Sequence, residues 1–419
     1  MSLIENDDLQ LCIESRTLNK PQGHDFTLSV DIVLPLSKGI VGVFGKSGAG
    51  KSTLLRVLAG LKKSGLEQAS LEKKILKEAE SKIHWQGKRI DKLPADKNPC
   101  LLQTQQAQLF PNLTVLANLT FVIKHSTWAS SCPFTLEQVI DWCGIEHLLN
   151  QPSTSLSGGE QQRVNLARSL LCGKPIILLD EPFSALDWNA RVELLGLLVQ
   201  LQQDYGLHFV IVSHSLKELA LCSQHMLVID NGEMLRSGPT TELIDKLTHD
   251  SSGSRSKTEE ADLNNQTRFS TLTLTNPVPL AEYHLTKWQL GEDEKSPVIY
   301  TKGLQNNSSS KSLSSHLPIN SPISYPISYP ISYPISYPIK EKLVTLDANR
   351  VSLSRQDNLD TSMLNHLKAS IDDITHIQHL VLVTLSVQGQ TLYAEISQLS
   401  FSNLKLQLGE TVFAQFKAL

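Results

Sequence analysis

The segment from Gly45 to Thr53 carries residue types whose spacing is suited to holding phosphate groups. It fits the pattern G-x-x-x-x-G-K-[ST], and its members are Gly45, Lys46, Ser47, Gly48, Ala49, Gly50, Lys51, Ser52 and Thr53. The glycines let backbone N–H groups close around phosphate oxygens, and a helix that begins here adds its partial positive charge. Lys51 is expected to reach the β- and γ-phosphates of a nucleotide, and the Ser52 hydroxyl to bind Mg²⁺.

A second chemical segment, Ile176–Glu181, is an apolar run that ends in two carboxylates. Asp180 is suited to holding Mg²⁺ through water, and Glu181 to polarising an attacking water. Phosphoryl transfer depends on such positioning and charge stabilisation more than on covalent chemistry. An apolar strand that ends in Asp-Glu is weak support by itself, so the prediction of nucleotide hydrolysis needs further motifs.

A parallel sheet is predicted to position these groups. Gly39–Gly45, Ile176–Asp180 and Phe209–Val212 read as buried central strands. Leu54–Leu61 and Ala190–Gln203 have the apolar spacing of helices. Because apolar runs and helical patterns alternate over the first part of the chain, the sequence predicts an α/β domain there.

The segment Leu156–Arg163 (LSGGEQQR) resembles the signature sequence of ATP-binding cassette (ABC) ATPases. In that family the helix that follows contacts ATP held by the opposite subunit, so the resemblance implies a homodimer with ATP between the chains. The ATP-binding residues that it implies in this segment are Ser157, Gly158, Gly159 and Glu160. Ser184–Asp187 matches the D-loop of the family and adds Asp187 to this set. His214 matches the switch histidine near the γ-phosphate, and with Glu181 it is a predicted catalytic residue.

The glutamine that the family places near Mg²⁺ has two candidates. Gln105 fills the position when counted back from Leu109–Pro111, and it is predicted to act in catalysis and in Mg²⁺ binding. Gln103 remains the alternative. An aromatic residue that stacks on adenine is expected before the first strand, and Phe26 is the nearby candidate, although it can equally be a core residue.

Length and composition exclude several classes of protein. The chain has 419 residues, which allows two or three domains. Its 38 Lys and Arg against 42 Asp and Glu give a net charge of −4, which argues against nucleic-acid binding through bulk positive charge. No apolar run approaches the ~18 residues needed to cross a bilayer, and the first residues lack the pattern of a secretory signal. Six scattered cysteines without a CxxC pair fit a reducing compartment. Any membrane role is therefore expected to depend on a partner protein, and the resemblance to importer ATPases described below implies a peripheral protein on the cytoplasmic face of the cell membrane.

Changes in composition, together with the resemblance of the motifs to ABC ATPases, divide the chain into five parts. An ABC ATPase domain is expected over 1–247, a linker and β segment over 248–304, a low-complexity insertion over 305–340, a strand over 341–357 and a β-barrel domain over 358–419. The insertion repeats PISY from Pro322 through Tyr337, and a proline at every fourth position excludes helix and central strand there. Within the first part, Gly65–Lys82 is expected to form a surface helix, either simply solvated or used for docking a partner.

The last part reads as an all-β module. Leu380–Val387 and Thr391–Ser397 predict a β-hairpin, and Leu404–Leu408 and Thr411–Lys417 predict two further strands. Thr361–Leu367, Ala394–Ser400 and Ala414–Ala418 resemble parts of a Mop domain, the small OB-like barrel of molybdate- and tungstate-binding proteins. Asp347–Ser354 matches the strand that precedes this module in molybdate-importer ATPases.

The resemblance to a Mop domain implies an oxyanion site. Its candidate ligands are Ser362, Ser397, Ser400 and Lys417, whose hydroxyl and ammonium groups suit a tetrahedral dianion. The chain departs from the family at Leu364, where Arg is frequent, and at Ala369, where Gly is frequent. The module is therefore expected either to sense molybdate or tungstate or to serve only as a dimerising scaffold.

Taken together, the motifs resemble the ATP-binding subunit of a molybdate importer. Gln108–Val115, followed by Asn118 and Leu119, resembles the segment by which importer ATPases receive a helix of the membrane permease. The resemblance implies ATP and Mg²⁺, an integral permease and an extracytoplasmic molybdate-binding protein. The alternatives are an importer ATPase for sulfate, iron, sugar or polyamine, a non-transport oxyanion sensor, and a soluble ABC mechanoenzyme.

Overall fold

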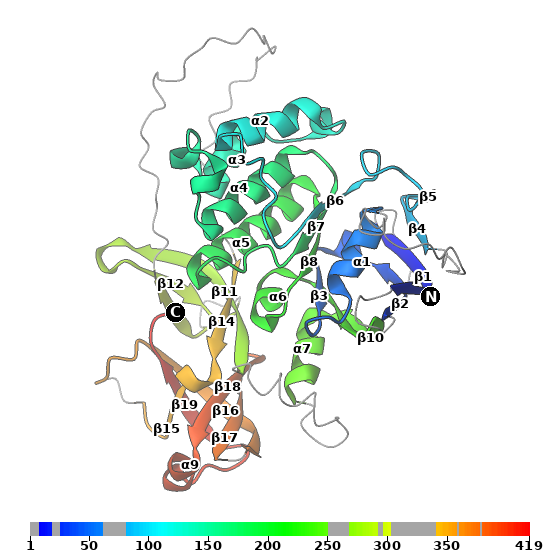
Figure 1. Ribbon diagram of the computed structural model, residues 1–419. Coiled ribbons are helices and arrows are strands. Elements are labelled where there is room, and N and C mark those ends of the chain that lie inside the picture. Colours follow the sequence, from blue (N-terminus) through cyan, green and yellow to red (C-terminus); the bar gives the residue numbers. More distant parts are fainter. Residues whose placement is uncertain are drawn as a thin grey trace. The chain divides into compact units, whose positions relative to one another are not determined.

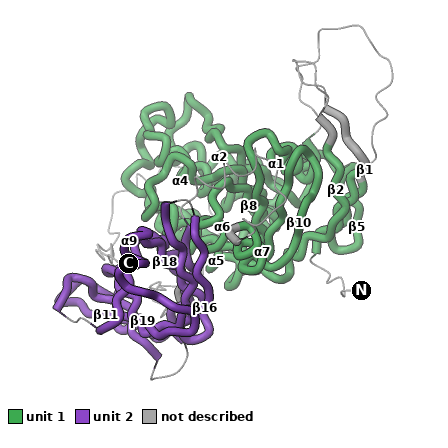
Figure 2. Tube along the Cα trace, turned by 90° about the horizontal axis from the view of Figure 1, so that it is seen from below, with its two compact units in different colours: residues 1–255 green, residues 256–419 purple. Residues whose placement is uncertain are grey.

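The computed structural model describes residues 8–18, 26–61, 81–249, 268–291, 296–302, 341–357, 360–377 and 379–419. The chain forms two compact units, Met1–Arg255 and Ser256–Leu419 (Figure 2). Three sequence predictions lie outside the described residues: the helix of Gly65–Lys82, the linker after the first domain, and the PISY repeat. Only the last two residues of the first of these segments are described, and they begin a strand. The boundaries between the five parts stay predictions.

The first unit is built on a ten-stranded sheet whose central strands are parallel. Its order is β5 (Lys88–Arg89), β4 (Ser81–Trp85), β1 (Leu9–Leu18), β2 (Phe26–Leu34), β10 (Glu233–Pro239), β9 (His225–Asp230), β3 (Val41–Phe44), β8 (His208–Val212), β7 (Ile176–Asp180) and β6 (Cys100–Gln103). Every residue of β7 is buried, as expected for a parallel strand covered on both faces. The α/β class predicted for this part of the chain is confirmed.

The helices of the first unit fall into two groups. Those that follow the central strands are α1 (Lys51–Leu58), α5 (Trp188–Tyr205), α6 (Leu216–Cys222) and α7 (Thr240–His249). A second group packs together (Figure 1): α2 (Val115–His125), α3 (Leu136–Cys143) and α4 (Gly158–Leu171). Thr114, Thr135 and Ser157 accept backbone hydrogen bonds at the starts of this second group, which satisfies otherwise unpaired N–H groups. None of the helices in the described ranges is long and apolar enough to cross a membrane.

The second unit contains two antiparallel sheets. The four-stranded sheet has the order β13 (Val298–Lys302), β12 (Leu285–Gln289), β11 (Phe269–Leu280) and β14 (Glu341–Asp347). The five-stranded sheet has the order β15 (Ser352–Ser354), β19 (Thr411–Phe416), β16 (Asn365–Ile377), β17 (Leu380–Val387) and β18 (Gln390–Ser397). One apolar cluster draws residues from both sheets, among them Trp288 and Phe416. The all-β class predicted for this region is therefore confirmed.

The β-hairpin prediction in the second unit is correct, because β17 and β18 pair along their length and turn at Gln388 and Gly389, both with positive φ. The strand predicted at Leu404–Leu408 is wrong. A short helix, α9 (Gln398–Leu404), ends there, and Lys405 adopts the left-handed conformation that closes a helix. Apolar alternation over so few residues does not distinguish a strand from a helix end followed by a turn.

The segment Asp347–Ser354 is not one strand. A 3₁₀ helix, Ala348–Arg350, separates β14 from β15. The Ala348 N–H donates to the Arg268 carbonyl at 2.8 Å, so the chain leaves one sheet there and enters the other.

Candidate functional site

The phosphate loop, Gly45–Gly50, connects β3 to α1 and has a shape that requires glycine. A Cβ on Gly45 would lie 2.2 Å from the Ile229 carbonyl oxygen at the end of β9. Gly48 and Gly50 have φ values of 82° and 104°, which residues with a side chain rarely adopt. The Gly232 N–H donates to the Ala49 carbonyl at 2.9 Å. The turn after β9 therefore holds the loop from one side.

The remaining residues of this motif differ in exposure. Ser47 is exposed at the tip of the loop, whereas Lys46, Ser52 and Thr53 are half-buried. Ser52 and Thr53 lie in the first turn of α1, where free N–H groups and the helix dipole favour an anion.

Lys51 is buried at the start of α1. Its Nζ donates to the carbonyl oxygens of Gly45 at 2.6 Å and Lys46 at 2.8 Å. Burial lowers the pKa of the ammonium, and the nearby charges of Glu181 and Asp180 oppose that shift. The cation is thus held at the inner side of the loop and faces both carboxylates.

Asp180 ends β7 and accepts a hydrogen bond from Ser52. Burial raises the pKa of its carboxyl, the Ser52 hydrogen bond opposes this, and the neighbouring charge of Glu181 adds to it. The structure therefore brings together the carboxylate and the hydroxyl that were predicted to bind Mg²⁺. Both supply oxygen ligands, which Mg²⁺ prefers, so this pair fits the ion.

Glu181 is the point at which loops following three parallel strands meet. Its Oε2 accepts from Gln105 Nε2 at 3.1 Å, and its Oε1 lies 3.4 Å from His214 Nδ1. Gln105 follows β6 and His214 follows β8, on either side of β7. Glu181 itself has a φ of 45°, an uncommon conformation for a residue with a side chain. The three predicted catalytic side chains are thus neighbours.

Gln103, the alternative to Gln105, has a different environment. It is the last residue of β6 and is buried, and its Oε1 accepts from the Ser169 hydroxyl of α4 at 2.9 Å. Gln105 is exposed. The geometry favours Gln105 as the glutamine near the carboxylates. The side chain of Phe26, the adenine-stacking candidate, lies outside what the structure describes.

The signature segment starts α4 with a reciprocal cap. The Ser157 N–H and hydroxyl each donate to Glu160 Oε2 at 2.7 Å, and the Glu160 N–H faces Ser157 Oγ at 3.4 Å. These hydrogen bonds lower the pKa of Glu160. Ser157 and Gly158 are exposed, so the start of the helix is accessible to an anion.

The signature segment also lies against the D-loop, Ser184–Asp187. A Cβ on Gly158 would be 3.2 Å from Ala185 Cβ, and one on Gly159 would be 2.9 Å from a Leu186 methyl carbon. Gln162 Nε2 donates to Ser184 Oγ at 3.1 Å, and the Ala185 N–H donates to Gln162 Oε1 at 3.0 Å. The signature glycines therefore permit close packing between these two segments.

Asp187, predicted to bind ATP, caps α5. Its Oδ1 accepts from the Ala190 N–H at 3.0 Å, and the residue is exposed. This capping role accounts for an aspartate at this position without any contact from a second chain. The cap uses only Oδ1, so Oδ2 remains accessible to a ligand.

The four oxyanion candidates fall into two pairs. Ser362 and Lys417 flank the paired ends of β16 and β19. Ser397 and Ser400 lie where β18 ends and α9 begins, and their hydroxyls are 2.9 Å apart. β18 ends beside the start of β17, which pairs with the far end of β16. The structure therefore places the two pairs at opposite ends of β16, and one chain does not unite them.

Sequence reasoning missed a buried polar network next to the D-loop. Arg191 of α5 pairs with Glu218 of α6, and Glu218 accepts from Ser213 at the end of β8. Arg191 lies far from Ser213 and Glu218 in the sequence and the three form no local motif, so no pattern identified them.

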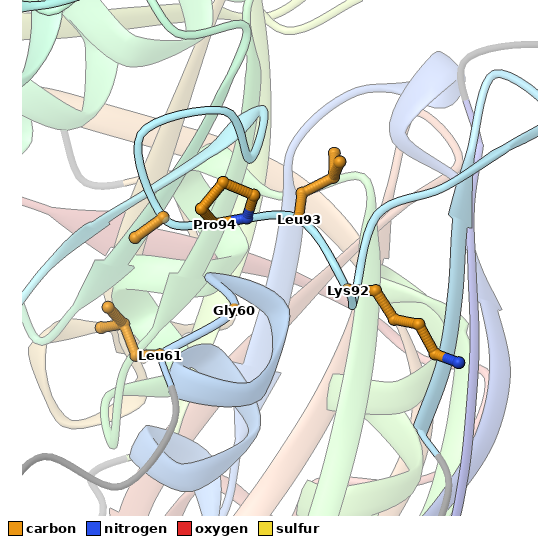
Figure 3. A pocket seen from close by; sticks show the side chains of 6 residues that line it. Gly60, Leu61, Lys92, Leu93 and Pro94 are labelled. Carbon is orange, nitrogen blue, oxygen red and sulfur yellow. The ribbon is translucent and has the colours of Figure 1, made fainter.

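One cavity of about 450 Å³ is lined by Gly60, Leu61, Lys92, Leu93, Pro94 and Ala95 (Figure 3). It lies beyond the C-terminal end of α1, whereas the phosphate loop precedes its N-terminal end. This cavity is therefore separate from the phosphate loop.

Comparisons with known proteins agree with these motifs. Residues 31–184 match the family model described as ABC transporter, and residues 361–418 match that of the TOBE domain. The TOBE match covers the region in which a Mop-like module was expected. The "Dimeric Structure of MJ0796, a Bacterial ABC Transporter Cassette" aligns with 55% of this chain and 98% of its own chain, at 23% identity and a TM-score of 0.46.

Several curated relatives align with nearly the whole chain. Proteins of Methylococcus capsulatus, Pseudomonas fluorescens and Pseudomonas aeruginosa, each named "Molybdenum import ATP-binding protein ModC", are 30% identical to it. Each alignment covers 94% of this chain and 95% of the relative. The chain therefore belongs to the ABC transporter family, as an ATP-binding subunit with a C-terminal TOBE domain.

Proposed function

We propose that this chain hydrolyses ATP to energise the uptake of molybdate or tungstate through a separate membrane permease. The observation that carries the proposal is the meeting of Gln105 and His214 at Glu181, beside the Asp180–Ser52 pair and Lys51. The cargo is inferred from the relatives, whose name refers to molybdenum import and which align over 94% of the chain.

The side chains divide the hydrolytic work. Backbone N–H groups of Gly45–Gly50 and the start of α1 bind the phosphates, and Lys51 neutralises charge on the transferred group. Glu181 orients the attacking water and accepts its proton, while His214 and Gln105 hold Glu181 in place from either side. Two oriented contacts on one carboxylate restrict its rotation, which matters because the reaction depends on positioning.

Ser52, Gln105 and Asp180 are the proposed Mg²⁺ ligands, with Asp180 acting through water. All three offer oxygen atoms, and Ser52 and Asp180 already contact each other. When bound, the ion neutralises negative charge on the β- and γ-phosphates.

A homodimer is the proposed active form. Ser157, Gly158, Gly159, Glu160 and Asp187 are assigned to ATP bound by the partner chain. Support comes from the exposed start of α4, where Ser157 and Gly158 are accessible to a ligand from outside the chain. A helix N-terminus of this kind favours a phosphate group.

A surface near Phe110 is the proposed docking site for a helix of the permease. Phe110 and Phe121 are 41% and 38% exposed, and their ring centroids are 4.7 Å apart. The guanidinium carbon of Arg168 lies 5.7 Å from the Phe110 ring centroid, and its Nη1 donates to the Gln108 carbonyl at 2.6 Å. A rigid, exposed aromatic surface suits burial against an apolar helix, and α4 joins this surface to the signature segment.

The second unit is proposed to contain the oxyanion-binding module, over 358–419. A site that uses Ser362, Lys417, Ser397 and Ser400 together needs two copies of the chain, since these residues lie at opposite ends of β16. The cassette is assigned to 1–247, with the linker and β segment of 248–304, the insertion of 305–340 and the strand of 341–357 between them. The proposed location is the cytoplasmic face of the membrane, and an extracytoplasmic molybdate-binding protein completes the set of partners.

The substitution Glu181→Gln tests the hydrolytic assignment. It keeps the shape of the side chain but removes the base, so ATP binding should remain while turnover nearly disappears. Unchanged turnover would refute the assignment of Glu181.

Calorimetric titration of the full chain with molybdate, tungstate and sulfate tests the cargo. Binding of the first two without sulfate supports the proposal. Molybdate uptake in cells that lack the gene, restored by wild type but not by Glu181→Gln, tests transport itself. Restoration of sulfate uptake instead would assign the chain to another anion importer.

A further inference from the structure

A partly buried ion pair connects the D-loop to the segment that carries His214. We propose that Arg191, Glu218 and Ser213 act as positioning residues that place His214 against Glu181 according to the position of the D-loop. This inference rests on the proposed roles of Glu181 and His214 in ATP hydrolysis. We call Ser213–Ser215 the switch loop.

Arg191 contacts the backbone of the D-loop. Its Nη2 donates to the Leu186 carbonyl at 2.8 Å and to the Ser184 carbonyl at 3.2 Å. Its Nη1 pairs with Glu218 Oε1 at 2.5 Å. The planar guanidinium holds its donors in a fixed geometry, so a shift of the D-loop carbonyls is transmitted to Glu218.

Glu218 continues the connection into the switch loop. Its Oε2 accepts from the Ser213 hydroxyl at 2.7 Å, and that hydroxyl oxygen accepts from the Ser215 N–H at 2.9 Å. Ser213 is 2% exposed and Glu218 is 7% exposed. The Glu218 carboxylate thus holds Ser213 directly, and it holds Ser215 through the Ser213 hydroxyl.

The position of His214 depends on this backbone. Its side chain is 66% exposed and lies 3.4 Å from Glu181. The backbone that carries the imidazole is fixed by Ser213 and Ser215, so their placement sets how closely His214 can approach Glu181. A small displacement of a catalytic group is enough to change turnover.

The network is better suited to positioning than to stability. Burying both charges costs desolvation that their attraction only partly offsets. Among the described residues, Arg191 Nε is also buried without a hydrogen-bond partner, so the guanidinium has a donor that this arrangement does not use. An arrangement of this kind is compatible with a second position of the D-loop.

The D-loop in turn contacts the signature segment, through Gln162 and through the close packing of Gly158 and Gly159. In the proposed dimer, ATP bound at the signature segment would shift the D-loop. The ion pair would carry that shift to His214.

The test compares Glu218→Gln with a matched control, Glu193→Gln, in the purified full chain. Glu193 is on α5 like Arg191, but its carboxylate is 72% exposed and lies 3.8 Å from Arg163. We expect Glu218→Gln to lower kcat by about ten- to a hundredfold, because small misplacement of a reacting group has effects of this size. KM for ATP should change by less than about twofold, since the phosphate loop is untouched. Glu193→Gln should match wild type.

A second comparison separates positioning from general destabilisation. In a His214→Ala background, Glu218→Gln should cause no further loss of kcat, because the imidazole that these positioning residues place is then absent. Losses that multiply in the double variant would overturn the proposal. If Glu218→Gln does not fold, Ser213→Ala removes the same contact with a smaller change and is judged by the same two measurements. A kcat within about twofold of wild type would also overturn the proposal. Glu181→Gln, assayed in parallel, shows separately whether the hydrolytic assignment holds.

Discussion

The substitution Gly45→Ala adds one methyl group at the tightest point of the phosphate loop. Its Cβ would lie 2.2 Å from the Ile229 carbonyl oxygen, whereas ordinary Cβ contacts begin at 3.4 Å. Ile229 is in β9, which pairs with β3 immediately before the loop, so that oxygen has no freedom to withdraw. The loop must therefore move away by about 1 Å.

Two effects of measurable size follow from that displacement. Overpacking of a close-packed region costs about 1–3 kcal/mol of folding free energy. The loop also carries the Gly45 carbonyl that anchors Lys51 Nζ at 2.6 Å. Misplacing a binding loop by about 1 Å is expected to lower kcat/KM for ATP about a hundredfold.

Gly196→Ala is the matched control for Gly45→Ala. Gly196 is an exposed residue of α5, and a Cβ there meets nothing within 4 Å. The same added methyl should stabilise the protein by about 0.5–1 kcal/mol, because alanine loses less conformational freedom in a helix than glycine. Urea unfolding and steady-state ATP hydrolysis measure both variants. If Gly45→Ala bound and hydrolysed ATP like wild type, the close approach to Ile229 would not be what this glycine is needed for.

Three further predictions follow from the burial of individual side chains. Gln105→Ala should reduce ATP turnover without changing the unfolding midpoint. Gln103→Ala should lower the free energy of unfolding by about 1–3 kcal/mol, because Gln103 is buried against Ser169 and its truncation leaves a cavity. The reverse outcome in paired activity and unfolding assays would exchange their roles. Asp180→Asn should abolish turnover and should stabilise the nucleotide-free protein at pH 7. Burial raises the pKa of Asp180 in the folded protein, so wild type loses stability as pH rises from the ordinary aspartate pKa through the raised value. The neutral asparagine does not have this loss. The difference in free energy of unfolding between Asp180→Asn and wild type should vanish below the ordinary aspartate pKa. Urea unfolding at several pH values measures it, and a difference that persists at low pH would contradict the prediction. Asn365→Ala should lower the free energy of unfolding by about 3 kcal/mol or more. The buried Asn365 side chain accepts from the Tyr300 N–H and donates to the carbonyl oxygens of Tyr300 and Lys417, and all three contacts would be lost. Resistance to urea equal to wild type would refute this.

Local patterns predicted the elements of the cassette well. The apolar run that became β7 and the leucine spacing of α5 are direct consequences of burial in a covered sheet and on one helix face. The same reasoning failed at Leu404–Leu408, where Ser397 begins and Lys405 ends a helix. The ends of this helix depend on the Ser397 cap and on the left-handed conformation of Lys405, and apolar alternation carries no information about either.

The sequence by itself determined the chemistry that the cassette can perform and the order of its motifs. Phosphate binding needs glycine, lysine and serine at fixed spacing in one turn, so a local pattern identifies it. Only the tertiary structure decided which glutamine meets Glu181, because Gln103 and Gln105 lie two positions apart, and one contacts α4 whereas the other contacts the carboxylate. It alone also joined Arg191 to Glu218 and separated the oxyanion candidates to the two ends of β16. These relations depend on how strands align and helices pack across long sequence separations, and no local spacing encodes them.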